Sequence, residues 1–219
     1  MEVYFVRHGQ TIFNVISRMQ GWSDTPLTEQ GIDDLKVTGK YLENTKFDAI
    51  YSSDLKRAVD TAEIIKKENR EDPPEIRVSD NFREIFFGFF EGSEAAKTWN
   101  MLGKPYGCNT QNEVAQKYSI EFARNILKDA DPKHWAENCE DLGVRIDRAF
   151  KQLLKENDDD SRVLVVTHGA YIETLLLKYF KSFFGDSRAF PENGSISIIK
   201  LTNNNVELNK FNIIPSRIH

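Results

Sequence analysis

The sequence predicts an α/β fold, a three-layer α/β/α sandwich with a mostly parallel central sheet, and three observations support this prediction. Two apolar runs, at 3–6 and 163–166, have the length and composition of buried strands. Each run leads into a His-Gly pair, His8-Gly9 and His168-Gly169. Between them, strand-like and helix-like segments alternate, as in sheets built from βαβ units. Because parallel strands end at one edge, we expect both histidines to face a single crevice there.

The first part of the chain supplies further strands of this sheet and the helices between them. Apolar spacing and turn residues predict, in order, a polar loop over 9–27, a helix over 28–44, a strand over 47–51, a helix over 55–65 and a short strand over 76–78. Asp54 directly precedes the second of these helices. Its short acidic side chain predicts that it caps the helix N-terminus.

A segment from about 86 to 135 interrupts this alternation. It is rich in aromatic residues and contains helical stretches around 111–128. We interpret it as a helical cap segment inserted over the sheet edge, within a single domain that spans residues 1–219. The remaining elements are a helix over 141–156, the strand that leads to His168, a buried helix over 170–180 and a hairpin of 195–201 with 206–211.

The composition is that of an ordinary soluble protein and restricts the partners. A formal charge of −5 and a pI near 5.5 argue against nucleic acid or an anionic membrane as a bulk partner. No signal peptide or membrane-spanning run is apparent, so a cytoplasmic protein is expected. Cys108 and Cys139 show no metal-ligand spacing. Whether the protein is a monomer or a homodimer is left open.

Two arginines are placed to bind an anion at the predicted crevice. Arg57 lies in the first turn of the helix over 55–65, about 200° around the helix from its apolar stripe, and so does not point into the helix's own core. A helix N-terminus favours anions, and a guanidinium beside it favours phosphate in particular. Arg7, next to His8, supplies a second guanidinium.

Taken together, the motifs resemble one known family in order along the chain. They are Arg7-His8-Gly9-Gln10-Thr11 with Asn14, Gly21-Trp22-Ser23-Asp24, Leu27-Thr28-Glu29-Gln30-Gly31, Ser52-Ser53-Asp54-Leu55-Lys56-Arg57-Ala58, Arg83-Glu84, Phe87-Gly88, Glu91-Gly92 and Thr167-His168-Gly169. This series closely resembles the histidine phosphatase superfamily, which includes the cofactor-dependent phosphoglycerate mutases. The resemblance spans nearly all of the chain except the insertion. It implies a phosphoglycerate mutase-like fold and one histidine phosphatase domain.

The resemblance also implies a role for each residue of the motifs. His8 would be the nucleophile that becomes phosphorylated, Arg7, Arg57 and His168 would hold the phosphoryl group, and Glu84 would be the proton donor. Further phosphate or substrate contacts would be Gln10, Thr11, Asn14 and Gln20. One position departs from the pattern, since Ala136-Glu137-Asn138 stands where many members have Gly-Glu-Ser. A supporting role for Glu137 is therefore left open.

The chemistry of phosphoryl transfer fits these residues. Two arginines and a protonatable histidine supply the positive charge that the transferred oxygens need, without a metal. His8 must attack as the neutral base, which requires an acceptor such as a backbone carbonyl to hold its other ring nitrogen. Glu84 must carry a proton, so its carboxyl pKa should be raised by burial. Phe86, Phe87, Phe89 and Phe90 follow it in sequence and are candidates to exclude water from it.

Three functions share this set of residues. The histidines show no HxH or HExxH spacing, so no metal and no cofactor is expected. The resemblance favours a metal-independent phosphomonoester hydrolase of the histidine acid type, acting on small phosphorylated metabolites through a phosphohistidine. The alternative is a cofactor-dependent phosphoglycerate mutase, although the paired arginines that bind its substrate carboxylate are not found. A catalytically silent member that binds phosphorylated ligands is less favoured. Such a member would be expected to lack His8, Arg57, Glu84 or His168, and all four are present.

Overall fold

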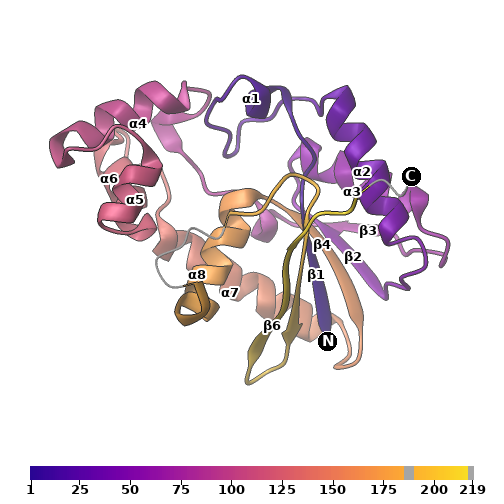
Figure 1. Cartoon of the computed structure of the whole chain (residues 1–219). Helices are drawn as coiled ribbons and strands as arrows, with labels where there is room; N and C mark the ends of the chain where they lie inside the picture. The colour runs from indigo at the N-terminus through magenta and orange to yellow at the C-terminus, as the bar shows by residue number, and fades with distance from the viewer. Residues whose placement is uncertain (185–189, 217–219) are drawn as a thin grey trace.

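The protein is described by a computed structural model that covers residues 1–184 and 190–216. Its centre is a six-stranded sheet in the order β3-β2-β4-β1-β5-β6 (Figure 1). The strands are β1 (Glu2–Arg7), β2 (Ala49–Ser52), β3 (Ile76–Val78), β4 (Arg162–Thr167), β5 (Ile196–Leu201) and β6 (Val206–Ile213). Strands β1 to β4 pair in parallel, whereas β5 and β6 form the predicted antiparallel hairpin. The mostly parallel sheet is therefore confirmed.

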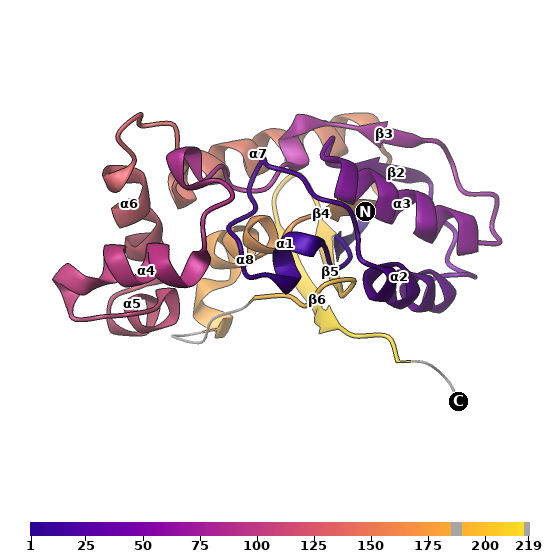
Figure 2. The same ribbon diagram turned by 90° about the horizontal axis from the view of Figure 1, so that it is seen from above.

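Helices cover both faces of this sheet, which confirms the three-layer prediction. On one face, α2 (Glu29–Tyr41) and α3 (Lys56–Glu68) lie side by side, and the core there joins Ala58, Ala62 and Ile65 to Leu164 and Val166 of β4. The other face is covered by α7 (Cys139–Glu156) and α8 (Gly169–Phe184), seen with the first pair in Figure 2. Both faces of β4 are buried, as its unbroken apolar run requires.

The helical segment lies beside the sheet and has its own core. It contains α4 (Ala95–Gly103), α5 (Gln111–Lys117) and α6 (Ile120–Ala130), at the left of Figure 1. Trp99, Leu102, Val114 and Leu127 are among its buried residues. The sequence predicts α5 and α6 but not α4, nor the short α1 (Ile12–Val15) inside the polar loop. The 3-10 turns are η1 (Asp80–Phe82), η2 (Gly88–Phe90) and η3 (Lys104–Tyr106).

The prediction that Asp54 caps α3 is wrong. Leu55 occupies the N-cap position, and its side chain makes no capping hydrogen bond. Asp54 instead accepts hydrogen bonds from Arg83 Nε at 2.7 Å and Arg83 Nη2 at 2.5 Å. A bidentate guanidinium is a stronger partner for a carboxylate than a backbone N–H. The ion pair ties the start of α3 to the segment that leads to Glu84.

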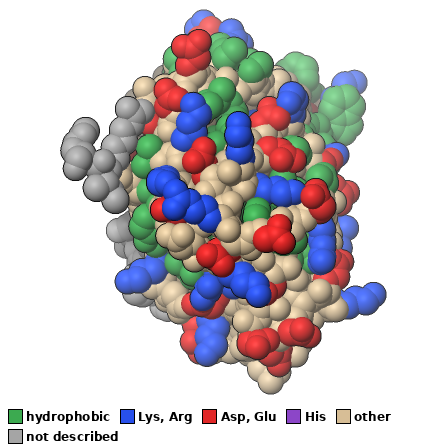
Figure 3. Space-filling model, turned by 90° about the vertical axis from the view of Figure 1, so that its right-hand side faces the viewer, with side chains coloured by type: hydrophobic (Ala, Val, Ile, Leu, Met, Phe, Trp, Pro, Cys, Tyr) green, Lys and Arg blue, Asp and Glu red, His purple; other side chains and the backbone are tan. Residues whose placement is uncertain are grey.

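Strand register brings the motifs to one edge of the sheet. Arg7 of β1 pairs with Thr167 of β4, so His8 and His168 directly follow paired positions. Ser52 of β2 pairs with Val166, which places the loop to α3 at the same edge. None of the described helices combines the length and the apolar character that crossing a bilayer requires. On the face shown in Figure 3, basic and acidic side chains are intermixed.

Candidate active site

His8 and His168 lie against each other beyond the carboxyl ends of β1 and β4. Their ring centroids are 5.2 Å apart, with the rings inclined at 60°. Both side chains are buried, His8 at 3% and His168 at 0% exposure. His8 and His168, which are 160 positions apart in the sequence, therefore lie together as predicted.

The ring of His8 is held as the neutral base with a defined tautomer. Its Nδ1 lies 2.8 Å from the carbonyl oxygen of Gly9. A carbonyl only accepts, so Nδ1 carries the proton and the lone pair is on Nε2. Burial, followed by the charges of Arg57 and Arg7, lowers the pKa of His8 well below the ordinary imidazole value. His8 therefore presents an unprotonated Nε2 in the folded chain.

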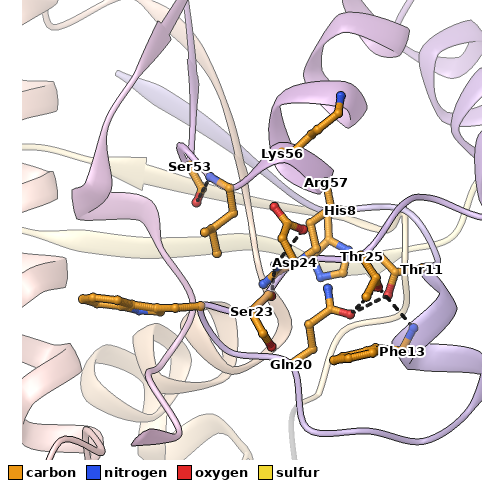
Figure 4. Close-up of polar contacts among 12 residues, drawn as sticks. His8, Thr11, Phe13, Gln20, Ser23, Asp24, Thr25, Ser53, Lys56 and Arg57 are labelled. Carbon is orange, nitrogen blue, oxygen red and sulfur yellow. Dashed lines mark hydrogen bonds and ion pairs between the residues drawn. The ribbon is translucent and has the colours of Figure 1, made fainter. Parts of the chain in front are cut away.

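Arg57 links the second histidine to the loop that follows Gln20. From the first turn of α3, its Nη2 donates to the carbonyl of Gly21 at 2.7 Å and lies 3.0 Å from Nδ1 of His168. Its Nη1 donates to the carbonyl of Ser23 and to Asp24 (Figure 4). A guanidinium only donates, so Nδ1 of His168 is the acceptor and the ring proton is on Nε2.

The second histidine is consequently a neutral hydrogen-bond donor. Burial, then the charge of Arg57, lowers the pKa of His168 well below its ordinary value. Its Nε2 has no hydrogen-bond partner among the residues that the structure describes. From the sequence, His168 is expected to be a protonatable cation. The geometry instead favours a neutral N–H that can donate to a phosphate oxygen.

Arg7 and Asn14 line the cavity that His8 also lines. Arg7 Nη1 donates to the carbonyl of Pro191 at 2.8 Å, and its guanidinium stands 4.9 Å from the centre of the Phe190 ring. Asn14 is contacted by Asn193, whose Nδ2 donates to the carbonyl of His8 at 2.9 Å and to Asn14 Oδ1 at 3.3 Å. Asn193 precedes the β5–β6 hairpin, and no motif in the sequence points to it.

Glu84 is buried against the first turn of α8. Its Oε1 accepts from the backbone N–H groups of Ile85 and Tyr171, and its Oε2 accepts from that of Ala170 at 2.9 Å. Burial raises the pKa of the Glu84 carboxyl above its ordinary value, although these N–H groups and the charges of Arg124 and Arg57 act in the opposite direction. The group can therefore hold a proton at a pH at which an exposed carboxyl has lost it.

The backbone of Glu84 is fixed by an ion pair that includes Glu137. Arg145 donates to the carbonyl of Arg83 and, at 2.9 Å, to that of Glu84. Glu137 pairs with Arg145 at 2.6 Å and accepts from the N–H of Phe86 at 2.9 Å. Glu137 thus supports the segment that carries Glu84, in spite of the altered residues on either side of it.

Of the other sequence-predicted contacts, Gln20 lines the cavity, whereas Gln10 and Thr11 do not. Gln20 Oε1 accepts from the hydroxyls of Thr11 at 2.9 Å and Thr25 at 3.1 Å (Figure 4). Its Nε2 is buried and has no hydrogen-bond partner in the described part of the chain. Thr11 therefore orients Gln20. Gln10 Oε1 accepts from the Thr28 hydroxyl at the start of α2, which places Gln10 in a structural contact.

Glu91, which sequence reasoning does not assign, joins two segments of the site. Its Oε1 accepts from the N–H groups of Trp22 and Phe87, and its Oε2 from the N–H and hydroxyl of Ser23 and the N–H of Gly21. The approach is so close that a Cβ on Gly21 would meet Glu91 Oε1 at 2.2 Å. Because Arg57 binds the carbonyls of Gly21 and Ser23, Glu91 also fixes Arg57.

His8 and Glu84 line one cavity of about 360 Å³, whereas Arg57 and His168 are buried behind His8 and are not among its lining residues. It is lined by cationic and polar residues that include Arg7, His8, Asn14, Arg18, Gln20, Glu84, Gln111, Arg124 and Asn193, and by apolar residues that include Phe13, Met19, Phe87, Trp99 and Phe190. The inserted helices contribute Trp99, Gln111 and Arg124. The cavity is therefore formed jointly by the sheet edge and the helical segment.

Only one of the four phenylalanines after Glu84 lines this cavity. It is Phe87. Phe86 stacks on Trp22 with centroids 4.6 Å apart, Phe90 belongs to the core of the inserted helices, and Phe89 is 62% exposed. Of the four candidates, Phe87 therefore borders the same cavity as Glu84, whereas Phe90 packs within the inserted segment.

Across residues 1–184 and 190–216, no three His, Cys, Asp or Glu side chains gather where they can hold a metal ion. His134 is exposed, and His219 lies outside the described residues.

A mostly parallel α/β sandwich with two histidines and two arginines at its carboxyl edge is the fold and site that the motifs in the sequence predict. The chain belongs to the histidine phosphatase superfamily (branch 1), whose family model matches residues 3–111 and 102–214.

Relatives include both mutases and phosphatases. The chain is 28% identical over 186 residues to a 2,3-bisphosphoglycerate-dependent phosphoglycerate mutase from Methanococcus vannielii, covering 78% of each chain. A solved phosphoglycerate mutase from Bacillus anthracis is similar with a TM-score of 0.89 and 31% identity, over 98% of this chain and 93% of that one. A solved mycobacterial glucosyl-3-phosphoglycerate phosphatase is similar with a TM-score of 0.72 and 25% identity, over 97% of this chain and 98% of that one. The phosphoglycerate mutase-like fold is thus confirmed.

Proposed function

We propose that this protein is a metal-independent phosphomonoester hydrolase of the histidine acid type, acting on small phosphorylated metabolites through a phosphohistidine. One observation carries the proposal. His8 is held neutral with Nδ1 bonded to Gly9, which leaves the lone pair on Nε2. The charges of Arg57 and Arg7 act on this ring, and the ring of His168 lies 5.2 Å from it between centroids. A nucleophile next to three donors suits an anionic phosphoryl group.

The reaction has two steps. In the first, Nε2 of His8 forms a bond to phosphorus as the bond to the leaving oxygen breaks, and Glu84 gives its proton to that oxygen. In the second, water attacks phosphorus, the phosphorus–nitrogen bond breaks, and the Glu84 carboxylate takes a proton from the water. The arginines and His168 act by neutralising charge on the transferred oxygens.

The proposal is tested with p-nitrophenyl phosphate, in the presence and absence of a chelator. We expect hydrolysis that the chelator leaves unchanged, and a phosphoryl group trapped on His8 by rapid quenching and mass spectrometry. His8→Ala should reduce hydrolysis to the uncatalysed background. Full activity of His8→Ala would reject the mechanism and would support a catalytically silent member whose activity comes from a contaminant.

A phosphoglycerate mutase is the second candidate, because relatives at 28% and 31% identity carry that name. Both functions use the same nucleophile, so the products must be measured. The protein is incubated with 3-phosphoglycerate and 2,3-bisphosphoglycerate. Release of inorganic phosphate supports the hydrolase, whereas rapid interconversion of phosphoglycerates with negligible phosphate release would establish the mutase instead.

A further inference from the structure

A turn over residues 191–195, just before β5, is hydrogen-bonded to both β1 and α2. The N–H of Gly194 donates to the carbonyl of Arg7 at 3.0 Å, and the carbonyl of Gly194 accepts from the Thr38 hydroxyl at 2.9 Å. Gly194 has a φ of +72°, in the left-handed region that favours glycine. These contacts give the turn one defined position at the end of β1, where its side chain Asn193 lines the cavity.

Asn193 uses both hydrogens of its amide within the protein. Its Nδ2 donates to the carbonyl of His8 at 2.9 Å and to Asn14 Oδ1 at 3.3 Å. Because a carbonyl oxygen only accepts, the atom that faces His8 must be the amide nitrogen, and the orientation of the Asn193 amide is fixed. An amide nitrogen carries two hydrogens, and both are bonded here. Asn193 therefore acts on a bound anion through the residues that it holds.

The bond from Asn193 fixes the orientation of a second amide, that of Asn14. Asn14 Oδ1 also accepts from the backbone N–H of Thr11 at 3.1 Å. A backbone N–H only donates, so this atom of Asn14 is the oxygen. With Oδ1 bonded twice, the group that Asn14 can offer to a ligand in the cavity is its Nδ2, which is a donor. A donor suits the oxygens of a phosphoryl group, whereas an oxygen in the same place would repel them.

The other bond of Asn193 refers this orientation to the nucleophile. The peptide unit between His8 and Gly9 is held at both ends, since its carbonyl accepts from Asn193 and its N–H donates to Thr61 Oγ1 at 3.1 Å. The next carbonyl, that of Gly9, holds the ring of His8. Asn193 is thus bonded to the same short segment that fixes the imidazole, and the donor of Asn14 is set relative to that segment.

We propose that Asn193 is a positioning residue that turns the amide nitrogen of Asn14 toward the phosphoryl group, with the carbonyl of His8 as its anchor. This inference rests on the proposed function, which places the phosphoryl group beside His8 and Asn14. Asn14 belongs to the short α1 and His8 follows β1, and Asn193 bonds to both. A donor that is oriented before the substrate arrives does not have to be ordered during binding.

The proposal is tested by calorimetric titration with inorganic phosphate in a double-mutant cycle of Asn193→Ala and Asn14→Ala. Each single variant should weaken phosphate binding about five- to tenfold, because one removes the donor and the other its orientation. Adding Asn193→Ala to Asn14→Ala should weaken binding by less than about twofold further, because the donor is already absent. Unchanged binding in Asn193→Ala, or its full loss repeated in the double variant, would overturn the proposal.

Ser195→Ala is the matched control within the same turn. The Ser195 hydroxyl donates to the carbonyl of Glu192 at 2.7 Å, so this variant removes a hydrogen bond of the turn and keeps the bond from Asn193 to Asn14. Titrated well below its melting temperature, it should bind phosphate within about twofold of the wild type. If Ser195→Ala weakens phosphate binding as much as Asn193→Ala does, the turn acts through stability alone and the positioning role is rejected.

The outcomes separate this inference from the proposed function, because phosphate binding needs no turnover. Coupling between Asn193 and Asn14 in a protein that hydrolyses no phosphomonoester would reject the hydrolase and retain the positioning role. Hydrolysis of p-nitrophenyl phosphate without that coupling would retain the hydrolase and reject the positioning role.

Discussion

At the scale of residues, the site depends on which ring nitrogen of each histidine carries the proton. Gly9 fixes the proton of His8 on Nδ1, and Arg57 keeps that of His168 on Nε2. The same buried surroundings shift acids and bases in opposite directions, lowering the pKa of both imidazoles and raising that of Glu84. A neutral nucleophile and a protonated acid can therefore coexist.

These shifts predict the pH dependence of hydrolysis. The acidic limb reports protonation of His8 and lies well below the ordinary imidazole pKa, and the alkaline limb reports ionisation of Glu84 above the ordinary carboxyl pKa. We expect kcat/KM for an alkyl phosphate to be bell-shaped, with its maximum on the acidic side of neutrality. Steady-state rates across buffers of constant ionic strength measure this. A rate that rises continuously to alkaline pH would contradict the assignment.

The leaving group determines how much Glu84 contributes. With an alkyl phosphate, whose leaving oxygen needs a proton, Glu84→Gln should lower kcat/KM by about 100-fold or more. With p-nitrophenyl phosphate the loss should stay below about tenfold, because p-nitrophenolate leaves without a proton. Glu63→Gln, on the exposed side of α3, is the control. Equal losses with both substrates would exclude proton donation by Glu84.

At the scale of elements, Glu91 connects the loop that precedes Asp24 to the segment that carries Glu84. Its two oxygens accept from four backbone N–H groups and one hydroxyl. In Glu91→Gln an amide NH₂ would replace one of these oxygens and would face donors, so the loop and Arg57 should move. We expect kcat/KM to fall about 10- to 100-fold and the dissociation constant of inorganic phosphate to rise with it.

The phosphate measurement distinguishes positioning from a general loss of stability. Calorimetric titration is done well below the melting temperature, with Glu63→Gln as the control. Unchanged phosphate binding in Glu91→Gln would show that Glu91 holds the fold without positioning Arg57.

Sequence reasoning predicts elements well where one pattern dominates and less well where tertiary contacts decide. The unbroken apolar run of β4 and the stripe of α3 leave little choice of structure. Asp54 looks equally suited to a helix cap and to an ion pair, and only the fold brings Arg83 to it. The short α1 buries no residue, so it has no apolar periodicity to detect.

The same distinction holds for the site. His8, Arg57, Glu84 and His168 stand in recognisable motifs, and the structure brings them together. Arg124 and Asn193 belong to no motif, because their contribution depends on how the inserted helices and the β5 hairpin pack against the sheet edge.

At the scale of the whole molecule, the sheet and the inserted helices have separate hydrophobic cores. Leu164 is buried within the sheet, whereas Leu127 is buried among α4 to α6. Each Leu→Ala substitution should cost about 2–5 kcal/mol in its own core. Leu164→Ala should lower the free energy of global unfolding and speed hydrogen exchange throughout the chain.

Leu127→Ala should instead speed exchange mainly in α4 to α6 and leave β1 and β4 protected. Hydrogen exchange followed by mass spectrometry measures both variants on the same peptides. If Leu127→Ala exposes the sheet to the same extent as Leu164→Ala, the two cores unfold as one unit.

The first turn of α8 has a consequence for the order of events in turnover. The N–H groups of Ala170 and Tyr171 in this turn donate to the carboxylate of Glu84. Once Glu84 has released its proton, those dipoles stabilise the resulting anion. In the proposed mechanism the helix therefore favours the phosphorylated enzyme before water attacks it, and a change in the first turn of α8 should alter the lifetime of that form more than the rate at which it appears.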